Sequence, residues 1–210
     1  MQNYSTEKSI IYVVDDDQNV REGLQSLFES VGLESQTFRS ATEFLSAKLP
    51  DAASCLILDV RLPGLGGLDF QTELARMKMD IPIIFITGHG DIPMSVKAMK
   101  GGAVEFLSKP VREQDLLDAV QLALGRAHTY RETHMRTRDL NERYAALSTR
   151  EKEVMRLVCA GLMNKQVAAE IGISEITVKV HRHNVMKKLG AKSLPDLVRM
   201  ADNLEISERK

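Results

Sequence analysis

The chain has little of what disulfide-rich, metal-rich or membrane-spanning proteins need. Its 210 residues include two cysteines, Cys55 and Cys159, and both lie in apolar segments. This placement favours core thiols of a reduced, cytoplasmic protein over a disulfide. No apolar run approaches the length of a membrane span and the N-terminus lacks a signal-peptide core, so we expect no membrane partner. The five histidines show no metal-ligand spacing, because His181 and His183 would face different sides of a helix.

Net charge is also nearly absent, at −1, but the charge is unevenly distributed. Residues 1–123 carry a balance of −7 and residues 124–210 a balance of +6. A basic half suggests a nucleic-acid partner, although an ordinary solvated surface explains the charge alone equally well. Hydrophobic residues make up 43% of the chain, enough for a packed core, and the length allows one or two domains.

Proline is missing between Pro110 and Pro195, and this stretch joins the two halves. Residues 112–143 contain Gly125 but are otherwise compatible with a helix. The first part of the stretch has an apolar helical face, whereas the second part is mostly charged. We predict one long helix or two abutting helices, with a flexible coil over residues 125–143 as the alternative.

Polar side chains follow most of the segments that the sequence predicts to be strands. The predicted strands are residues 10–14, 34–38, 55–58, 83–86 and 104–107. Asp15 and Asp16 follow the first, Asp59 the third, Thr87 the fourth and Lys109 the fifth. Strands that alternate with helices form a parallel sheet, and reactive groups gather at the carboxyl ends of its strands. We therefore expect three carboxylates, a hydroxyl and an amine to converge at one edge.

This set of groups indicates phosphoryl chemistry. Three neighbouring carboxylates need a cation to stay ionised, and hard oxygen ligands beside a transferable phosphate suit Mg²⁺. Asp59 could be the nucleophile that forms an aspartyl phosphate, while Lys109 and Thr87 contact the phosphoryl oxygens. Taken singly, each residue has a plainer explanation, as a helix cap, a turn carboxylate, a strand-end residue or a solvated charge. Their common position at strand ends favours the phosphoryl site.

Residues from about 8 to 122 resemble the receiver domain of two-component response regulators. The motifs are V-V-D-D at 13–16, L-D-V-R-L-P-G at 58–64 with Gly67, I-T-G-H-G at 86–90 and E-F-L-S-K-P at 105–110. The resemblance implies an α/β fold with a doubly wound, five-stranded parallel sheet of the flavodoxin-like type. Leu62 and Gly88 stand where Met and Ala are frequent, and both keep the residue class.

The receiver resemblance assigns roles to individual residues. Asp59 would be the phosphoacceptor and Mg²⁺ the cofactor. The metal ligands would be Asp15, Asp16, Asp59 and the main-chain carbonyl of Arg61, with Asp16 the direct acidic ligand. The phosphoryl-binding and switch residues would be Thr87, Lys109 and Phe106. A cis bond before Pro110 would aim Lys109 into the site, and Arg61 and His89 would shield the acyl phosphate from water.

From residue 145 onward the sequence predicts an all-α unit of four helices. Its expected N-caps are Ser148, which forms a capping box with Glu151, then Asn164, Ser174 and Ser193. Gly161, Gly172 and Gly190 would end the first three helices. The second and third helices, joined by a tight turn that contains glycine, are a candidate helix-turn-helix.

The third of these helices, residues 175–190, has two different faces. Val178, Val185 and Leu189 fall on one side, which we expect to face the core. The opposite side carries Ile176, Val180, His183, Asn184 and Lys187, with Lys179 at its flank. Such a mixture suits the DNA major groove, where an apolar side chain can meet a thymine methyl and polar ones reach base edges and phosphates.

Residues 145–203 resemble the LuxR/FixJ/NarL-type DNA-binding domain. The runs that carry this are L-S-T-R-E-K-E-V, G-L-M-N-K-Q-V-A and I-S-E-I-T-V-K-V-H-R-H-N-V-M-K-K-L. G-D-I-P-M and G-L-M-N-K-Q also resemble the StyR/TodT-like regulators of aromatic-compound catabolism. By resemblance, Lys179, Val180 and His183 would face bases, whereas Asn164, Lys165, Ser174, Thr177 and Lys187 would contact phosphates.

The two resemblances together imply a transcription factor of the FixJ/NarL response-regulator family, not an enzyme. We expect a receiver domain over 1–122, a helical linker over 123–144 and the DNA-binding domain over 145–210. A sensor histidine kinase would phosphorylate Asp59, and the surface of residues 91–101 and the fifth strand would then pair two receivers. The homodimer would bind double-stranded DNA and act on RNA polymerase.

Two other functions remain open at this stage. A haloacid-dehalogenase-like phosphatase also uses an aspartate nucleophile, but Val60 and Arg61 leave it without the usual second carboxylate. A DNA-binding protein with a vestigial receiver would need no phosphate, and the intact acidic and basic strand-end residues argue against it.

Overall fold

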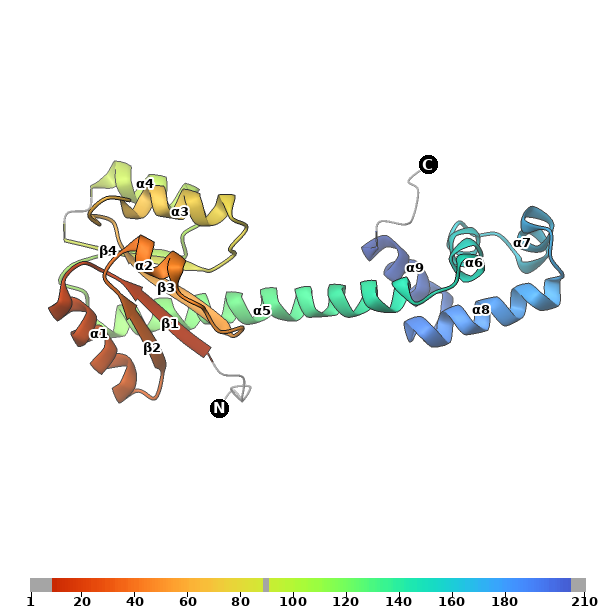
Figure 1. Cartoon of the computed structure of the whole chain (residues 1–210), viewed down its shortest axis with the longest axis horizontal. Helices are drawn as coiled ribbons and strands as arrows, with labels where there is room; N and C mark the ends of the chain where they lie inside the picture. Colours follow the sequence, from red (N-terminus) through yellow and green to blue (C-terminus); the bar gives the residue numbers. More distant parts are fainter. Residues whose placement is uncertain (1–8, 89–90, 205–210) are drawn as a thin grey trace. The chain divides into compact units, whose positions relative to one another are not determined.

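The computed structural model describes residues 9–88 and 91–204, and the chain divides into two compact units, 1–131 and 132–210. In its described part, the first unit holds a five-stranded, all-parallel sheet in the order β2-β1-β3-β4-β5 (Figure 1). The strands are β1 (Ser9–Val14), β2 (Glu34–Phe38), β3 (Ala53–Asp59), β4 (Ile83–Thr87) and β5 (Glu105–Ser108). This order confirms the predicted flavodoxin-like receiver fold.

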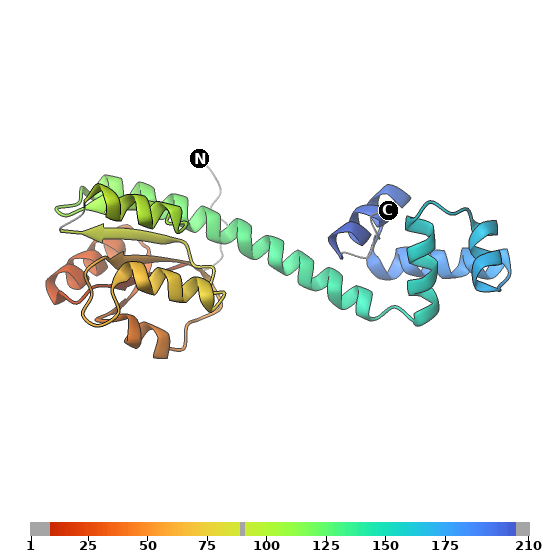
Figure 2. The same ribbon diagram turned by 90° about the horizontal axis from the view of Figure 1, so that it is seen from above.

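Helices cover both faces of the sheet (Figures 1 and 2). They are α1 (Gln18–Ser30) and α5 (Glu113–Ala145) on one face, and α2 (Ala41–Ser46), α3 (Gly67–Arg76) and α4 (Ile92–Lys100) on the other. Side chains alternate along each strand, so β1 sends Ile11 and Val13 to the α1/α5 side and Tyr12 to the opposite side. Because both faces are buried, the strands are apolar almost throughout, and polar groups are left to the strand ends.

Helix α5 runs unbroken through 33 residues. Residues 125–143 are therefore helical, and the alternative of a flexible coil is wrong. Its section up to Arg131 belongs to the first unit, where Ala123 and Ala127 are buried. Three polar contacts hold this section to the sheet. Ser9 Oγ lies 3.0 Å from His128 Nε2, the Tyr130 hydroxyl donates to Asp80, and Arg131 pairs with Asp51.

These contacts lie at the amino-terminal edge of the sheet, because their partners are the first residue of β1 and the residues just before β3 and β4. The expected domain boundaries at residues 122 and 144 both fall inside α5, and they stay a prediction.

The second unit is all-helical in its described residues, with α6 (Thr149–Cys159), α7 (Asn164–Ile171), α8 (Glu175–Leu189) and α9 (Leu194–Asn203) following the end of α5. Val154, Val167, Val178 and Leu197 of the four helices are fully buried in one core, against which Tyr144 of α5 packs. Ser148, Ser174 and Ser193 cap α6, α8 and α9 as predicted. The predicted capping box of Ser148 and Glu151 is present.

The predicted role of Asn164 as a helix cap is wrong. Helix α7 begins at Asn164, and Met163 holds the N-cap position. The Met163 backbone N–H donates to Gln166 Oε1 at 2.8 Å, so a glutamine at the third helical position satisfies the N–H of the cap residue. Asn164 is then free for a contact elsewhere, and its Oδ1 accepts a hydrogen bond from Arg182 of α8 at 3.2 Å.

Candidate functional site

The three predicted carboxylates meet at the carboxyl edge of the sheet. Asp15 and Asp16 follow β1, and Asp59 ends β3, the strand beside it. One carboxylate oxygen from each lies within 4.8 Å of the others. Asp15 and Asp59 are buried, whereas Asp16 is exposed. This convergence, predicted from the strand ends, is confirmed.

Lys109 brings a positive charge to the same place. Its Nζ donates to Asp15 Oδ2 at 2.6 Å and to Asp59 Oδ2 at 3.0 Å. Its backbone N–H donates to the carbonyl oxygen of Thr87 at 2.8 Å, and the bond to Pro110 is cis, as predicted. Burial alone would lower the pKa of Lys109, but the hydrogen bonds and charges of the two carboxylates outweigh it and raise the pKa. The ammonium therefore stays protonated.

Asp15 has every polar atom occupied. Its N–H donates to the carbonyl oxygen of Phe38, Oδ1 accepts from the Asp17 N–H at 2.9 Å, and Oδ2 accepts from Lys109. Its own carbonyl oxygen accepts from Arg21 Nη1 at 2.7 Å. Burial raises the pKa of Asp15 despite these donors, and the charge of Asp59 raises it further. Asp15 is thus a tightly held carboxylate at the inner side of the site.

The remaining predicted receiver residues lie around this cluster. Thr87 ends β4 and is buried, and β4 pairs with β3 so that Asp59 lies beside Ile86. Phe106 of β5 is half-buried, with its ring 6.1 Å from that of Phe85. The Arg61 N–H donates to Asp59 Oδ1 at 3.1 Å. His89 lies outside the described residues.

Gly67 shows how closely the chain is packed behind Asp59. A Cβ at this position would lie 2.3 Å from the carbonyl oxygen of Asp59, far inside contact distance. The Gly67 N–H donates to the carbonyl oxygen of Val60 at 2.9 Å, which closes the loop onto the start of α3. Only glycine allows this approach, so Gly67 fixes the backbone that carries Asp59.

The donor set of the cluster fits Mg²⁺. Its ligand atoms are carboxylate oxygens, which Mg²⁺ prefers, and one member, Asp16, is exposed to solvent from which a hydrated ion arrives. The part of the chain that the structure describes has no other cluster of three His, Cys, Asp or Glu residues that could hold a metal ion.

The second candidate site is the outer face of α8. Val178, Val185 and Leu189 are buried, as predicted, while Ile176 and Val180 are 74% and 54% exposed. Of the eight residues predicted to contact DNA, Lys165, Ser174, Thr177, Lys179, Val180, His183 and Lys187 are exposed and Asn164 is half-buried. Gly172 has a left-handed φ of 68° between α7 and α8, the turn that the helix-turn-helix requires.

A buried carboxylate that sequence reasoning did not connect to α8 holds this helix from inside. Glu151 of α6 accepts a hydrogen bond from Lys188 Nζ at 2.7 Å and one from the Ser148 N–H at 2.7 Å. The hydrogen bond from Lys188 is the main reason that the pKa of Glu151 is lowered. The sequence signal existed, since Lys188 precedes the core residue Leu189, but the pairing of α6 with α8 was needed to find it.

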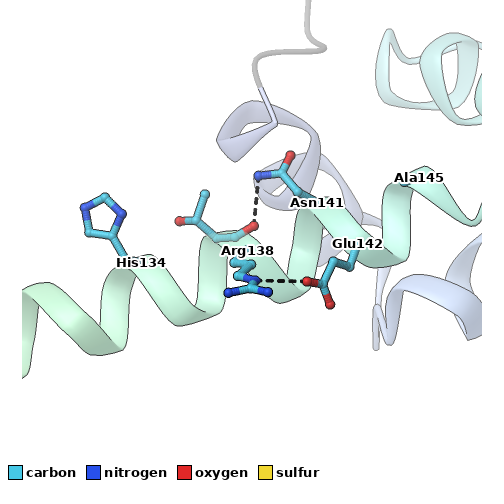
Figure 3. Close-up of a pocket in the computed structure, with 6 residues that line it drawn as sticks. His134, Arg138, Asn141, Glu142 and Ala145 are labelled. Atoms are coloured by element: carbon cyan, nitrogen blue, oxygen red, sulfur yellow. Dashed lines mark hydrogen bonds and ion pairs between the residues drawn. The ribbon is translucent and has the colours of Figure 1, made fainter. Parts of the chain in front are cut away.

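A shallow hollow on the side of α5 lies apart from both sites (Figure 3). All its lining residues come from this one helix, and two pairs of them bond to each other. Asn141 Nδ2 donates to the Thr137 carbonyl oxygen and Arg138 pairs with Glu142, both at 3.0 Å. No group from a second element converges on it, so we assign it no ligand. No helix in the described ranges is long and apolar enough to cross a membrane.

Comparisons with known protein families match both halves of the chain. The response regulator receiver domain matches residues 11–121, and the luxR family of bacterial regulatory proteins matches residues 145–201. The receiver match contains the acidic cluster, and the luxR match contains α7 and α8.

Known proteins resemble the chain over almost its whole length. Nodulation protein W of Bradyrhizobium diazoefficiens is 60% identical over 200 residues, which is 95% of this chain and 88% of that protein. Response regulator protein TodT of Pseudomonas putida is 49% identical over 207 residues, 99% of this chain and 91% of that protein. The solved structure of the response regulator StyR, at 48% identity, gives a TM-score of 0.85 over 93% of this chain and 98% of that one.

Proposed function

Because this chain belongs to the two-component response regulators with a receiver domain and a LuxR-type DNA-binding domain, and is therefore a transcriptional regulator, we propose that phosphorylation of Asp59 controls its binding to DNA. The observation that carries the proposal is the position of Lys109. Its ammonium bridges Asp59 and Asp15, where a phosphoryl group on Asp59 would place negative charge.

In the proposed reaction, an Asp59 carboxylate oxygen attacks the phosphorus of a phosphohistidine on the sensor kinase. The new P–O bond forms as the P–N bond breaks, and the histidine leaves with the P–N electron pair. Asp16, Asp59, Asp15 and the main-chain carbonyl of Arg61 would hold Mg²⁺, which when bound neutralises charge on the phosphoryl group. The Arg61 N–H already bonds to Asp59 Oδ1, which fixes the rotamer of the nucleophile.

The proposed switch begins with two hydrogen bonds. Lys109 exchanges its contact with Asp59 Oδ2 for a phosphoryl oxygen, and Thr87 donates its hydroxyl to another. Phe106 is half-buried next to the core and turns into the space that Thr87 leaves. The buried position of Thr87 supports this step, because a buried hydroxyl can be drawn only toward a new acceptor inside the site.

The proposed dimer surface is the outer face of α4 beside β5. Ile92, Val96 and Met99 lie on one side of α4 and are 79%, 45% and 45% exposed. Three large apolar side chains at helical spacing on a solvent face favour contact with a second protein. A change at Phe106 in β5 reaches this face directly, so phosphorylation would favour a homodimer.

At the DNA, α8 would enter the major groove. Lys179, Val180 and His183 would contact bases, while the five other predicted contact residues would hold phosphates. A symmetric dimer would bind two half-sites related by its two-fold axis. RNA polymerase as a partner and a cytoplasmic location complete the proposal, and both rest on the family to which the chain belongs.

Phosphoryl incorporation from acetyl phosphate in the presence of Mg²⁺ tests the proposed function. We expect wild-type protein to be labelled and Asp59→Asn to remain unlabelled, because an amide oxygen cannot replace the carboxylate nucleophile. Asp16→Asn should be labelled more slowly and need more Mg²⁺. Undiminished labelling of Asp59→Asn would place the acceptor elsewhere.

A further inference from the structure

The Arg21 side chain makes one hydrogen bond in the described structure, and its acceptor belongs to the backbone of the acidic site. It lies in the first turn of α1, is half-buried, and donates from Nη1 to the carbonyl oxygen of Asp15 at 2.7 Å. The short distance is typical of a charge-assisted hydrogen bond. No motif that carries the receiver resemblance includes Arg21.

The carbonyl oxygen of Asp15 belongs to the peptide group that precedes Asp16. β1 ends at Val14, and the last backbone contact beyond it is the Asp15 N–H to the carbonyl oxygen of Phe38. The Asp15 carbonyl therefore accepts from a side chain instead of a neighbouring strand. Because a peptide group is planar, a donor that fixes this carbonyl also fixes the N–Cα bond of Asp16.

Asp16 depends on its backbone more than the other two carboxylates do. Lys109 holds both Asp15 and Asp59, and backbone N–H groups hold both as well. In the described residues, the exposed carboxylate of Asp16 has no hydrogen bond or ion pair. Its position is set by its backbone, which begins at the peptide group that Arg21 holds.

We propose that Arg21 is a positioning residue for Mg²⁺, which holds the Asp15–Asp16 peptide group so that the Asp16 carboxylate faces the ion. This inference rests on the proposed function. It also predicts the direction in which Mg²⁺ affinity changes when Arg21 is removed. As a mere positive charge near a cation site, Arg21 would weaken Mg²⁺ binding and its removal would tighten it. As a positioning residue, its removal weakens binding.

Calorimetric titration of the unphosphorylated full-length protein with Mg²⁺ shows whether loss of Arg21 weakens or tightens Mg²⁺ binding. We expect Arg21→Met to raise the Kd for Mg²⁺ about tenfold, the usual cost of losing an outer partner of a metal ligand. Arg21→Lys keeps the charge with a stem one bond shorter, so it should recover part of the affinity. Arg76→Met is the matched control. Arg76 is exposed on α3, where the described residues give it an ion pair with Glu73, so its loss should leave the Kd unchanged.

Labelling by acetyl phosphate supplies the second measurement. The Mg²⁺ concentration for half-maximal rate should rise by the same factor in Arg21→Met, while the rate at saturating Mg²⁺ stays near the wild-type value. A general disruption of the fold would also lower the rate at saturating Mg²⁺. If Arg21→Met does not fold, Arg21→Gln replaces it with the same expectations.

Each outcome decides one question. A Kd that is unchanged or lower in the neutral variant overturns the positioning role, as does a rate that saturating Mg²⁺ fails to restore. A wild-type protein that neither binds Mg²⁺ nor accepts phosphate at Asp59 overturns the proposed function itself.

Discussion

A single ammonium group reduces the repulsion between two buried carboxylates at the centre of the candidate site. Lys109 bonds to Asp15 and Asp59, whose charges would otherwise repel each other. Lys109 does not fully compensate the burial of Asp15, because burial still raises the pKa of that carboxyl. Ionised Asp15 therefore costs stability, which is expected where a site is built for chemistry and not for packing.

We expect Asp15→Asn to raise the free energy of unfolding at neutral pH. In the unfolded chain Asp15 ionises at the ordinary carboxyl pKa, whereas in the folded chain it ionises at a higher one. Below both values the wild type and the variant should differ little. As pH rises through this range, the unfolded wild-type chain ionises first, so the wild type loses stability relative to the variant.

Urea unfolding of a 1–131 fragment without Mg²⁺, at pH 4 to 8, measures this difference. The asparagine keeps an oxygen for the Asp17 N–H, and Asp59 remains for Lys109. Asp69→Asn, at a solvated position, is the control and should show no such trend. A variant that is less stable than the wild type at neutral pH would contradict the expected cost.

The contacts of single residues show which features of the site could be predicted from the sequence. Strand ends predicted the meeting of Asp15, Asp59 and Lys109, because the carboxyl ends of parallel strands must share one edge. The contact of Arg21 with a carbonyl oxygen could not be predicted, because it depends on the reach of one side chain. The cap of α7 was misassigned because it lies one residue before the first good capping residue, with Met163 at the cap and Gln166 accepting from the Met163 N–H.

At the scale of the element, α8 combines an apolar inner face with an outer face that is not simply polar. Exposed Ile176 and Val180 lie among amines and an imidazole. Its periodicity was readable from the sequence, since buried and exposed residues alternate as a 3.6-residue repeat predicts. Its attachment through Lys188 to the buried Glu151 was not, because that contact joins residues 37 apart.

Two substitutions on α8 should weaken DNA binding differently. Lys187→Ala should reduce affinity for every sequence and flatten the salt dependence by about one unit, because one phosphate contact is lost. His183→Ala should relax the preference at one base position, at a cost of roughly 1–3 kcal/mol for the favoured site. Titrations of specific and random duplexes at several salt concentrations measure both. Equal weakening on all sequences by both variants would remove His183 from the base-reading set.

In helix α5 the sequence does not show where the first unit ends, because no break in its helical pattern marks the boundary. Its residues 123–131 carry the buried Ala123 and Ala127 and the three polar contacts to the amino-terminal edge of the sheet. The family match ends at residue 121, before any of them. These contacts join residues 50 to 119 apart in the chain, so no local pattern predicts them.

We expect a fragment of residues 1–131 to be more stable than one of residues 1–122 by about 3 kcal/mol. The shorter fragment loses the buried side chains at 123, 124 and 127 and opens the apolar surface beneath them. Urea unfolding of the two fragments gives the difference. A fragment extended to residue 139 controls for length alone and should match 1–131. Equal stability of 1–122 and 1–131 would mean that this section of α5 only lies on the surface.

At the scale of the whole molecule, an acidic receiver unit and a basic DNA-binding unit share one helix. The basic half suggested a nucleic-acid partner without deciding it against a solvated surface, and the luxR family match agrees with the suggestion. In the proposed function phosphate and DNA bind different residues, so control would pass through association of two chains or through α5. We propose association as the means of control, because Ile92, Val96 and Met99 of α4 are exposed.

Phosphorylation should therefore tighten binding to a two-half-site operator only when the receiver is present. Full-length protein treated with acetyl phosphate should bind more tightly and sediment as a dimer. A fragment of residues 132–210, which keeps Leu140 and Tyr144 against its core, should show no gain. Ile92→Asp in the full-length chain should keep the labelling and lose the dimer. A full-length protein that binds no better when phosphorylated would separate the receiver from DNA binding.

The half-buried ring of Phe106 has an optical consequence. The chain contains no tryptophan, so light absorbed only by indole produces no emission from the wild-type protein. A tryptophan at position 106 would be the sole indole, next to Phe85 at the border between core and solvent. Its emission maximum depends on the polarity around the indole, and a ring that moves inward shifts that maximum to shorter wavelength. The moment of switching could then be followed in real time, without a label and without DNA.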